Sequence, residues 1–158
     1  MHPYHKSLTA TVYIVHRKKV LLHLHKKYNT WFPVGGHLSP DELPHRAAMR
    51  EAMEESGFAV TLCDHCVTNP SLGRVDRVPS PLLICHEGIG HEEEFLDFIY
   101  IARLTDAHGS DMPVPVSGEG ESRTFRWFSL AELSDPDTDL KIHVRNTAIA
   151  ALEAVAEG

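Results

Sequence analysis

The sequence predicts a mixed α/β (α+β) fold, because short runs rich in β-branched and aromatic residues alternate with two helix-length segments. The expected helices span residues 44–56 and 141–156. The expected strands are residues 7–15, 20–25, 58–63, 81–86 and 95–104, with a last strand inside 121–128. No repeat or linker divides the 158 residues, so we expect residues 1–158 to form a single domain.

Three of these segments indicate how the sheet is built. Residues 7–15 and 20–25 are separated only by the polar segment 16–19, which predicts a hairpin. The run 95–104 is almost continuously apolar, as in a central strand. Asp97 interrupts this run. Because burying a charge is costly, Asp97 lies either at a strand end or in the cleft of a site.

The first helix has recognisable start and stop signals. Pro44 suits the first helical position, where a missing N–H costs nothing. Gly57 suits the left-handed residue that ends a helix, and Phe58 would then return the chain to the core. Further along the chain, Ser129 predicts an N-capped helical turn over residues 129–133.

The composition argues against some partners. A formal net charge of −7 disfavours electrostatic binding to a nucleic-acid polymer or a membrane surface. No apolar run approaches the length of a membrane span, and residues 1–6 lack the apolar segment of a signal peptide. We therefore expect a cytoplasmic protein that does not bind membranes or nucleic-acid polymers.

The three cysteines leave two interpretations open. Cys63 and Cys66 form a CxxC, and Cys85 is followed by His86, so a zinc site from these four residues is conceivable. Only one CxxC pair is present, however. Reduced, partly buried thiols are the more ordinary interpretation.

Three carboxylates mark one face of the first helix. Glu51, Glu54 and Glu55 are spaced at i, i+3 and i+4, so all three project to one side. Their mutual repulsion weakens an isolated helix, and a cation among them would relieve it. Carboxylate oxygens suit a hard divalent ion such as Mg²⁺ or Mn²⁺. The ordinary alternative is a solvated acidic face.

The residues around this face are much more specific. Residues 36–58 match the pattern Gly-x5-Glu-x7-Arg-Glu-U-x-Glu-Glu-x-Gly-U, where U is apolar. The fixed positions are Gly36, Glu42, Arg50, Glu51, Glu54, Glu55 and Gly57, and the apolar ones are Ala52 and Phe58. A chance match is on the order of 10⁻⁸ per starting position. The stretch resembles the Nudix box of the Nudix (MutT-like) hydrolases.

The resemblance implies a fold and an activity. The fold would be an α/β/α sandwich around a mixed sheet. The activity would be hydrolysis of a nucleoside diphosphate linked to another moiety, by attack of water at phosphorus, with Mg²⁺ or Mn²⁺ as cofactor. Dimers are common in the family, so a homodimer is also an expectation.

The resemblance also implies roles for the box residues. Glu51, Glu54 and Glu55 would hold the metal, with the carbonyl of Gly36 as a further ligand, and Glu54 or Glu55 would act on the water. Arg50 would orient the glutamates through an ion pair. Glu42 would support the junction between the loop and the helix.

Flanking segments resemble the family more weakly. Residues 126–133 (RWFSLAEL) resemble an end-of-fold pattern in which an acidic residue six positions before the tryptophan often completes the metal site. That residue is Glu121, which is also a candidate base, with Glu119 as the fallback. Residues 31–37 (WFPVGGH) resemble the approach to the box, and Trp31 is either a core anchor or a wall for the substrate.

Other substrate contacts are expected in loops. Arg74 and Arg77 lie in a Pro- and Gly-containing segment, and each is either a solvated surface residue or a contact for substrate phosphate. Asp97 is a candidate if it faces the cleft. The box leaves the substrate open among nucleoside triphosphates, nucleotide sugars and dinucleotides. Two alternatives remain: a non-catalytic nucleotide-binding module of the same fold, and an enzyme similar to isopentenyl diphosphate isomerase.

Overall fold

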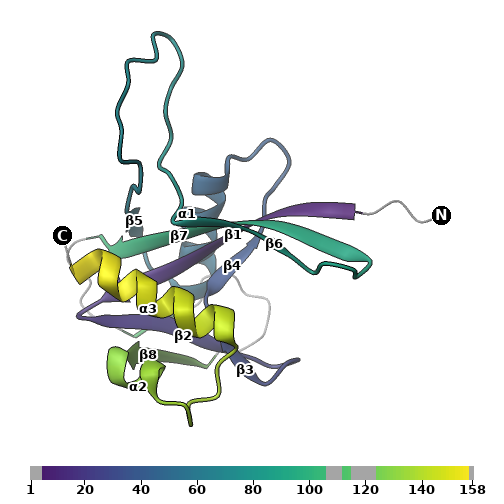
Figure 1. Ribbon diagram of the computed structural model, residues 1–158, viewed down its shortest axis with the longest axis vertical. Helices are drawn as coiled ribbons and strands as arrows, with labels where there is room; N and C mark the ends of the chain where they lie inside the picture. Colours follow the sequence, from purple (N-terminus) through teal and green to yellow (C-terminus); the bar gives the residue numbers. More distant parts are fainter. Residues whose placement is uncertain (1–4, 106–111, 115–123, 157–158) are drawn as a thin grey trace.

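A mixed β-sheet with helices on both faces forms the molecule (Figure 1). The computed structural model describes residues 5–105, 112–114 and 124–156. Its elements are β1 (His5–His16), β2 (Lys19–His25), β3 (Thr30–Phe32), β4 (Val34–His37), α1 (Pro44–Ser56), β5 (Val60–Leu62), β6 (Leu83–Glu87), β7 (Glu93–Leu104), β8 (Phe125–Ser129), α2 (Leu130–Ser134) and α3 (Ile142–Ala156). The mixed α/β class expected from the sequence is confirmed.

The sheet is built around the parallel pair β1 and β7. These two strands pair from His5–Glu93 to Val15–Arg103. The main path of the sheet is β3-β2-β1-β7-β5, and β4, β6 and β8 add to β1, β7 and β2 respectively. Among the described strands, the other pairings are all antiparallel. The sheet is therefore mixed, as expected, and β7 is one of its central strands.

The predicted hairpin between β1 and β2 is present but short. The two strands pair only at Val15–Val20 and His16–Lys19. They then diverge, and β4 pairs with β1 from Thr9–His37 to Val12–Val34, while β3 pairs with β2. The divergence places Gly35 and Gly36 of β4 directly beside β1.

Side chains on β1 alternate between two cores, as the period of two in a strand requires. Ala10, Val12 and Ile14 pack with α1, whereas Tyr13 and Val15 pack with α3. The small helical residues that allow α1 to approach the sheet closely are Ala47, Ala48 and Ala52. Figure 1 shows α1 behind the sheet and α3 in front of it, which is the expected α/β/α arrangement.

The predicted bounds of α1 are confirmed at both ends. The helix begins at Pro44 and ends at Ser56. Gly57 is left-handed, with φ of 77°, and its N–H donates to the Met53 carbonyl at 2.9 Å. The predicted cap at Ser129 is also present: its hydroxyl accepts from the N–H of Glu132. This reciprocal capping box fixes the start of α2.

Several strand ends differ from the expectation. The run 58–63 forms a strand only over Val60–Leu62, because Gly57 and Phe58 complete the turn out of α1. Strand β7 begins earlier than expected, at Glu93. Asp97 is therefore inside a strand, so the strand-end interpretation is wrong. Among the described residues, no helix has the length and apolar character needed to cross a bilayer.

Candidate active site

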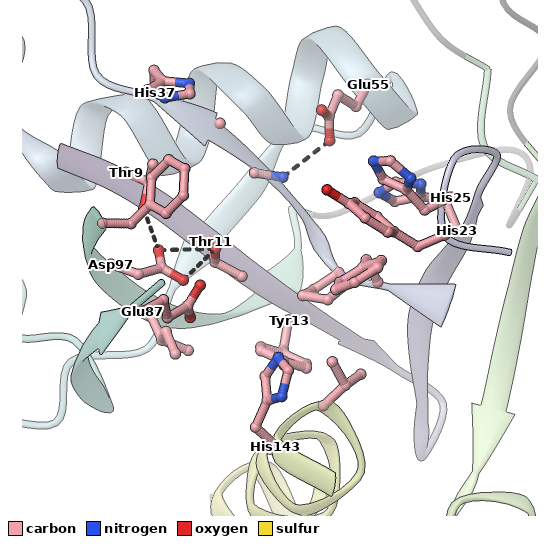
Figure 2. Close-up of a pocket in the computed structure, with 18 residues that line it drawn as sticks. Thr9, Thr11, Tyr13, His23, His25, His37, Glu55, Glu87, Asp97 and His143 are labelled. Carbon is pink, nitrogen blue, oxygen red and sulfur yellow. Dashed lines mark hydrogen bonds between the residues drawn. The ribbon is translucent and has the colours of Figure 1, made fainter. Parts of the chain in front are cut away.

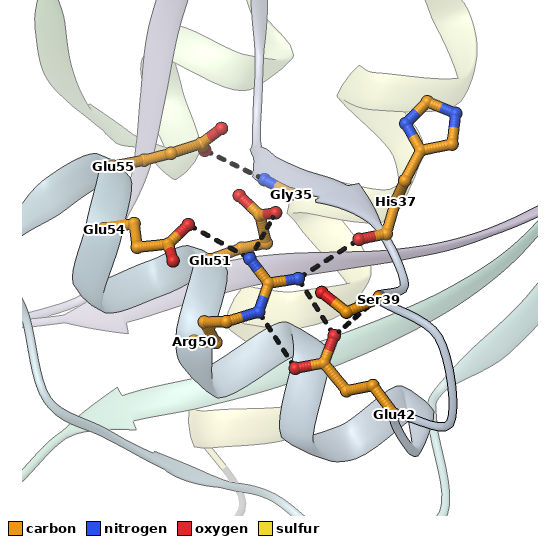
Figure 3. Close-up of polar contacts among 8 residues, drawn as sticks. All are labelled: Gly35, His37, Ser39, Glu42, Arg50, Glu51, Glu54 and Glu55. Carbon is orange, nitrogen blue, oxygen red and sulfur yellow. Dashed lines mark hydrogen bonds and ion pairs between the residues drawn. The ribbon is translucent and has the colours of Figure 1, made fainter. Parts of the chain in front are cut away.

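Arg50 lies at the centre of the box and contacts Glu42, Glu51 and Glu54 (Figure 3). Its Nε lies 2.9 Å from Glu42 Oε2 and its Nη2 lies 2.9 Å from Glu42 Oε1. Its Nη1 lies 3.0 Å from both Glu51 Oε1 and Glu54 Oε2. The guanidinium matches the planar two-oxygen geometry of a carboxylate, which is why a bidentate pair with Glu42 forms.

The same guanidinium connects the helix to the loop before it. Arg50 Nη2 also donates to the His37 carbonyl at 3.1 Å, and the backbone N–H of Ser39 donates to Glu42 Oε1 at 3.0 Å. The hydrogen bond from Arg50 is the main cause that lowers the pKa of Glu42 to about 2. Glu42 is thus ionised at neutral pH and connects the loop to α1 through Ser39 and Arg50, while its supporting role stays a prediction.

The glycine pair of β4 lies against the acidic face of α1. The Gly35 N–H donates to Glu55 Oε2 at 3.0 Å. At Gly36, an added Cβ would lie 2.5 Å from Glu51 Oε1 and 2.8 Å from Glu51 Cδ, closer than real side chains approach. Only glycine therefore lets the β4 backbone pass this near the Glu51 carboxylate.

The donor chemistry of this face suits a hard divalent ion. Two carboxylates of this face, Glu51 and Glu54, both form an ion pair with the Arg50 guanidinium, whose Nη1 lies 3.0 Å from each of them. Within the described residues, no three acidic, histidine or cysteine side chains converge as a ready metal cluster. The arrangement thus supplies oxygen ligands of the right kind next to the glycines of β4, with the carboxylates held by Arg50 and by the Gly35 N–H.

A pocket of about 410 Å³ opens beside these groups (Figure 2). Gly36 and Glu55 form part of its wall, and Thr9, Thr11 and Tyr13 of β1 form another part. The remaining lining side chains include His23, His25, Tyr28, Phe32, Glu87, Phe95, Asp97 and His143. Its volume falls within the usual range for small-molecule sites. The pocket therefore joins the box to the α3 face of the sheet.

Asp97 faces this pocket and is tightly held. It is 5% exposed and accepts hydrogen bonds from Thr9 Oγ1 at 3.1 Å and from Thr11 Oγ1 at 2.9 Å. Glu87 on β6 hydrogen-bonds to Asp97, and burial followed by the Asp97 charge raises the pKa of Glu87 to about 7. Of the two positions considered for Asp97, the cleft is the one that the structure shows.

Other expected substrate residues lie elsewhere. Trp31 packs against Phe128 with ring centroids 5.2 Å apart, as a core anchor does, and it is not among the residues that line the pocket. Arg74 is exposed in the long loop between β5 and β6, which projects from the sheet in Figure 1. Arg77 Nη1 lies 2.7 Å from Asp64 Oδ2. Substrate contact by Trp31, Arg74 or Arg77 stays a prediction.

Two further expectations have different outcomes. Glu121, with its fallback Glu119, lies outside the described residues, so its role stays a prediction. The cysteines at 63, 66 and 85 are free thiols, and no metal cluster forms among the described residues. The zinc interpretation of these cysteines is therefore not supported.

Several pocket residues were not expected from the sequence. Thr9 and Thr11 are polar positions of period two inside an apolar strand, and that alternation is a signal that could have marked a polar face. No comparable pattern in the neighbouring sequence predicts that Glu87 and His143 line the pocket. They reach the pocket because β6 pairs with β7 and because α3 packs across the sheet.

Comparisons with known proteins agree with this geometry. A family model described as NUDIX domain matches residues 5–148. A NUDIX-family hydrolase from Clostridium perfringens is 31% identical over 96% of this chain and 99% of that chain, with a TM-score of 0.79. No curated protein matches the sequence.

Two more distant structures share the fold. The MutT NUDIX hydrolase from Burkholderia pseudomallei is 23% identical over 96% of this chain and 98% of that chain, with a TM-score of 0.59. The Ap4A hydrolase of C. elegans is 16% identical over 97% of this chain and 98% of that chain, with a TM-score of 0.59. On the match to residues 5–148 and the relative at 31% identity, the chain belongs to the Nudix family and is a Nudix hydrolase.

Proposed function

We propose that this hydrolase is a metal-dependent pyrophosphohydrolase that cleaves the diphosphate linkage of a nucleoside diphosphate joined to another moiety. The observation that carries the proposal is the position of the α1 carboxylates. They lie beside the Gly35–Gly36 backbone, and one of them, Glu55, forms part of a pocket of about 410 Å³. A substrate in that pocket would present its phosphates to the acidic face of α1.

The expected metal ligands are Glu51, Glu54 and Glu55, with the carbonyl of Gly36 as a further donor. A divalent ion such as Mg²⁺ or Mn²⁺ held by these oxygens would polarise phosphoryl oxygens, lower the pKa of water and orient the leaving group. It would also neutralise the repulsion between the box carboxylates and the substrate phosphates. An acidic chain with a net charge of −7 needs such a local positive charge to bind a polyanion.

The reaction is a hydrolysis of a phosphoric anhydride. The oxygen of water forms a bond to phosphorus, and the bond between that phosphorus and the bridging oxygen breaks. The leaving phosphate keeps the electron pair of that bond, and the proton of the water passes to a carboxylate. We assign the carboxylate to Glu54 or Glu55, with Glu121 as the alternative base.

Arg50 acts as a positioning residue in this scheme. Its guanidinium contacts Glu42, Glu51 and Glu54 at 2.9–3.0 Å, so it sets the direction of two expected ligands. Preorganised ligands lose little conformational freedom when the ion binds, which favours catalysis. Arg50 itself does not attack the substrate.

A substrate panel tests this function. The purified protein is incubated with nucleoside triphosphates, nucleotide sugars and dinucleoside polyphosphates, with Mg²⁺ or Mn²⁺, and the products are identified by ³¹P NMR. We expect at least one compound to yield a nucleoside monophosphate, with the activity abolished by EDTA and restored by excess Mg²⁺. Turnover that is indifferent to EDTA, or no turnover of any compound by folded protein, would contradict the proposal.

Three further proposals concern the domain organisation, the location and the oligomeric state of the protein. We propose that residues 1–158 form one domain, that the protein works in the cytoplasm, and that it is a homodimer. Light scattering after size-exclusion chromatography gives the mass directly. For a 17.7-kDa chain, a dimer and a monomer are readily separated by that measurement.

A further inference from the structure

The Asp97–Glu87 pair is the feature of the pocket that the hydrolysis does not use. Asp97 belongs to a central strand and is 5% exposed. Two hydroxyl groups, from Thr9 and Thr11, donate to it from the neighbouring parallel strand. An ionised buried carboxylate is costly unless donors compensate it, and these two threonines supply that compensation.

A second acid next to Asp97 adds to that cost. Glu87 lies on β6, where Cys85 is the register partner of Asp97 and Glu87 is the partner of Phe95. Glu87 is thus diagonal to Asp97, and Figure 2 shows the two carboxyl groups side by side in the pocket. Two neighbouring carboxyl groups repel each other when both are ionised, so the pair is not explained by folding stability alone. Two acids that line the same pocket can instead be explained by hydrogen bonds to a ligand.

The surroundings of the pair limit what that ligand can be. Phe95 is two residues before Asp97 on the same face of β7, and its ring also lines the pocket. Two negative or partly negative carboxyl groups repel phosphate, so the phosphates should lie toward Gly36 and Glu55 instead. The group near Asp97 should then be flat, uncharged or cationic, and rich in hydrogen-bond donors. A nucleobase with an amino group has these properties.

We propose that Asp97 and Glu87 are specificity-determining residues that select a nucleobase carrying an exocyclic amino group, namely adenine, cytosine or guanine, over uracil and thymine. The proposal rests on the proposed function, because it takes the phosphates to lie at the box. The amino group donates to Asp97. The neighbouring ring nitrogen contacts Glu87. Uracil and thymine instead present a single N–H between two carbonyl oxygens, whose lone pairs would face the Asp97 carboxylate.

The proton of Glu87 lets this recognition adapt to different bases. With its proton, Glu87 donates to the unprotonated ring nitrogen of adenine or cytosine. Without it, Glu87 accepts from the ring N–H of guanine. The raised pKa of Glu87, about 7, allows both states near neutral pH. Among the described residues, titratable groups that interact electrostatically with the pair include Tyr13 on β1, Cys85 on β6 and His143 on α3.

Binding of nucleoside monophosphates tests the selectivity apart from catalysis. AMP, CMP, GMP, UMP and TMP contain no anhydride bond, so they bind without being consumed. Isothermal titration of the wild-type protein should show tighter binding of AMP, CMP and GMP than of UMP and TMP, by at least about tenfold, as expected for hydrogen bonds to a charged group. Equal affinities within about threefold would overturn the proposal.

Conservative variants then assign the selectivity to the two acids. Asp97→Asn and Glu87→Gln keep the size of each side chain but remove its charge. We expect Asp97→Asn to reduce the preference for amino-bearing bases to within about threefold, and Glu87→Gln to weaken GMP more than AMP or CMP. Glu92→Gln, an exposed acid just before β7, is the control and should keep the wild-type preference. An unchanged preference in Asp97→Asn would overturn the assignment.

The two proposals fail in different ways. The same variants are assayed for kcat/KM with the five corresponding triphosphates and Mg²⁺, and circular dichroism confirms that each variant is folded. If the wild-type protein hydrolyses its substrates without discrimination between bases, the selectivity proposal is wrong and the proposed function stands. If it prefers AMP, CMP and GMP but hydrolyses no anhydride, the proposed function is wrong and the selectivity of the pocket stands.

Discussion

Among single residues, the two glycines of β4 differ in what an added side chain would meet. An added Cβ at Gly35 would lie 2.5 Å from the Ala10 carbonyl oxygen and 2.9 Å from Thr11 Cα, which are backbone atoms. At Gly36 the atoms that would be met belong to the end of the Glu51 side chain, at 2.5 Å and 2.8 Å. Backbone cannot yield easily, whereas a glutamate side chain can rotate.

This difference predicts opposite phenotypes. We expect Gly35→Ala to lower the free energy of unfolding by about 1–3 kcal/mol, as an overpacked site does. We expect Gly36→Ala to keep nearly wild-type stability but to reduce kcat by at least about tenfold, because Glu51 is displaced from its expected place as a ligand. Thermal unfolding and substrate turnover of both variants are the measurements. A Gly36→Ala protein with full activity would count against a role for this close approach.

A second prediction at this scale concerns the protonation of Glu87. Burial and the Asp97 charge raise the pKa of Glu87 from 4.5 to about 7, so between these pH values the folded protein binds more protons than the unfolded chain. Its contribution to stability is therefore fully present below pH 4.5 and is lost as the pH rises toward 7. The unfolding free energy should fall across this range.

The matched variant isolates that effect. Glu87→Gln has no titrating group at position 87, so its stability should fall less than that of the wild type between pH 4.5 and 7. Urea unfolding at several pH values gives both curves. Parallel curves for the two proteins would show that Glu87 does not exchange its proton in this range.

Among the elements, helix α1 has a capped C-terminus but no side-chain cap at its N-terminus. Gly57 closes the helix in the left-handed conformation. At the other end Leu43 is extended, with φ of −79° and ψ of 146°, and it provides no side-chain cap. Its side chain is 53% exposed, so little burial would be lost on replacing it. The first turn of α1 thus lacks one of the usual stabilising contacts.

A better cap should stabilise the protein without changing its chemistry. Leu43→Ser places a hydroxyl where it can accept from an N–H of the first turn, and we expect it to raise the unfolding free energy by about 0.5–1 kcal/mol. Ser129→Ala removes the existing cap of α2 and should lower the unfolding free energy by about the same amount. Thermal unfolding of both variants tests the pair. A Leu43→Ser protein that is less stable than the wild type would show that Leu43 makes contacts that outweigh a cap.

The elements also show which features could be predicted from sequence. The bounds of α1 were predictable because Pro44 and Gly57 act locally, within the helix itself. The contact of Arg50 with Glu54 was predictable because residues four apart lie on one helix face. The Asp97–Glu87 pair was not, since it depends on the register between β6 and β7 and on the parallel pairing of β7 with β1. Pairing between strands distant in sequence leaves no local periodic signal.

At the scale of the whole molecule, one pocket joins elements from both faces of the sheet. Glu55 comes from α1 on one face, Asp97 faces the other side from β7, and His143 comes from α3. The short β1–β2 pairing makes this connection, because the divergence lets β4 carry Gly35 and Gly36 to the pocket wall. Under the proposed function, the metal and phosphates would lie toward Glu55, and the base would lie toward Asp97.

Replacing the box carboxylates one at a time tests whether they catalyse metal-dependent hydrolysis. Glu54→Gln and Glu55→Gln are compared with the wild type on the best substrate at saturating Mg²⁺, with Glu153→Gln, an exposed residue of α3, as the matched control. The proposed function predicts a loss of kcat of about 10²–10⁴-fold in at least one box variant, with folding intact, and no change in the control. Full activity in both Glu54→Gln and Glu55→Gln would contradict it.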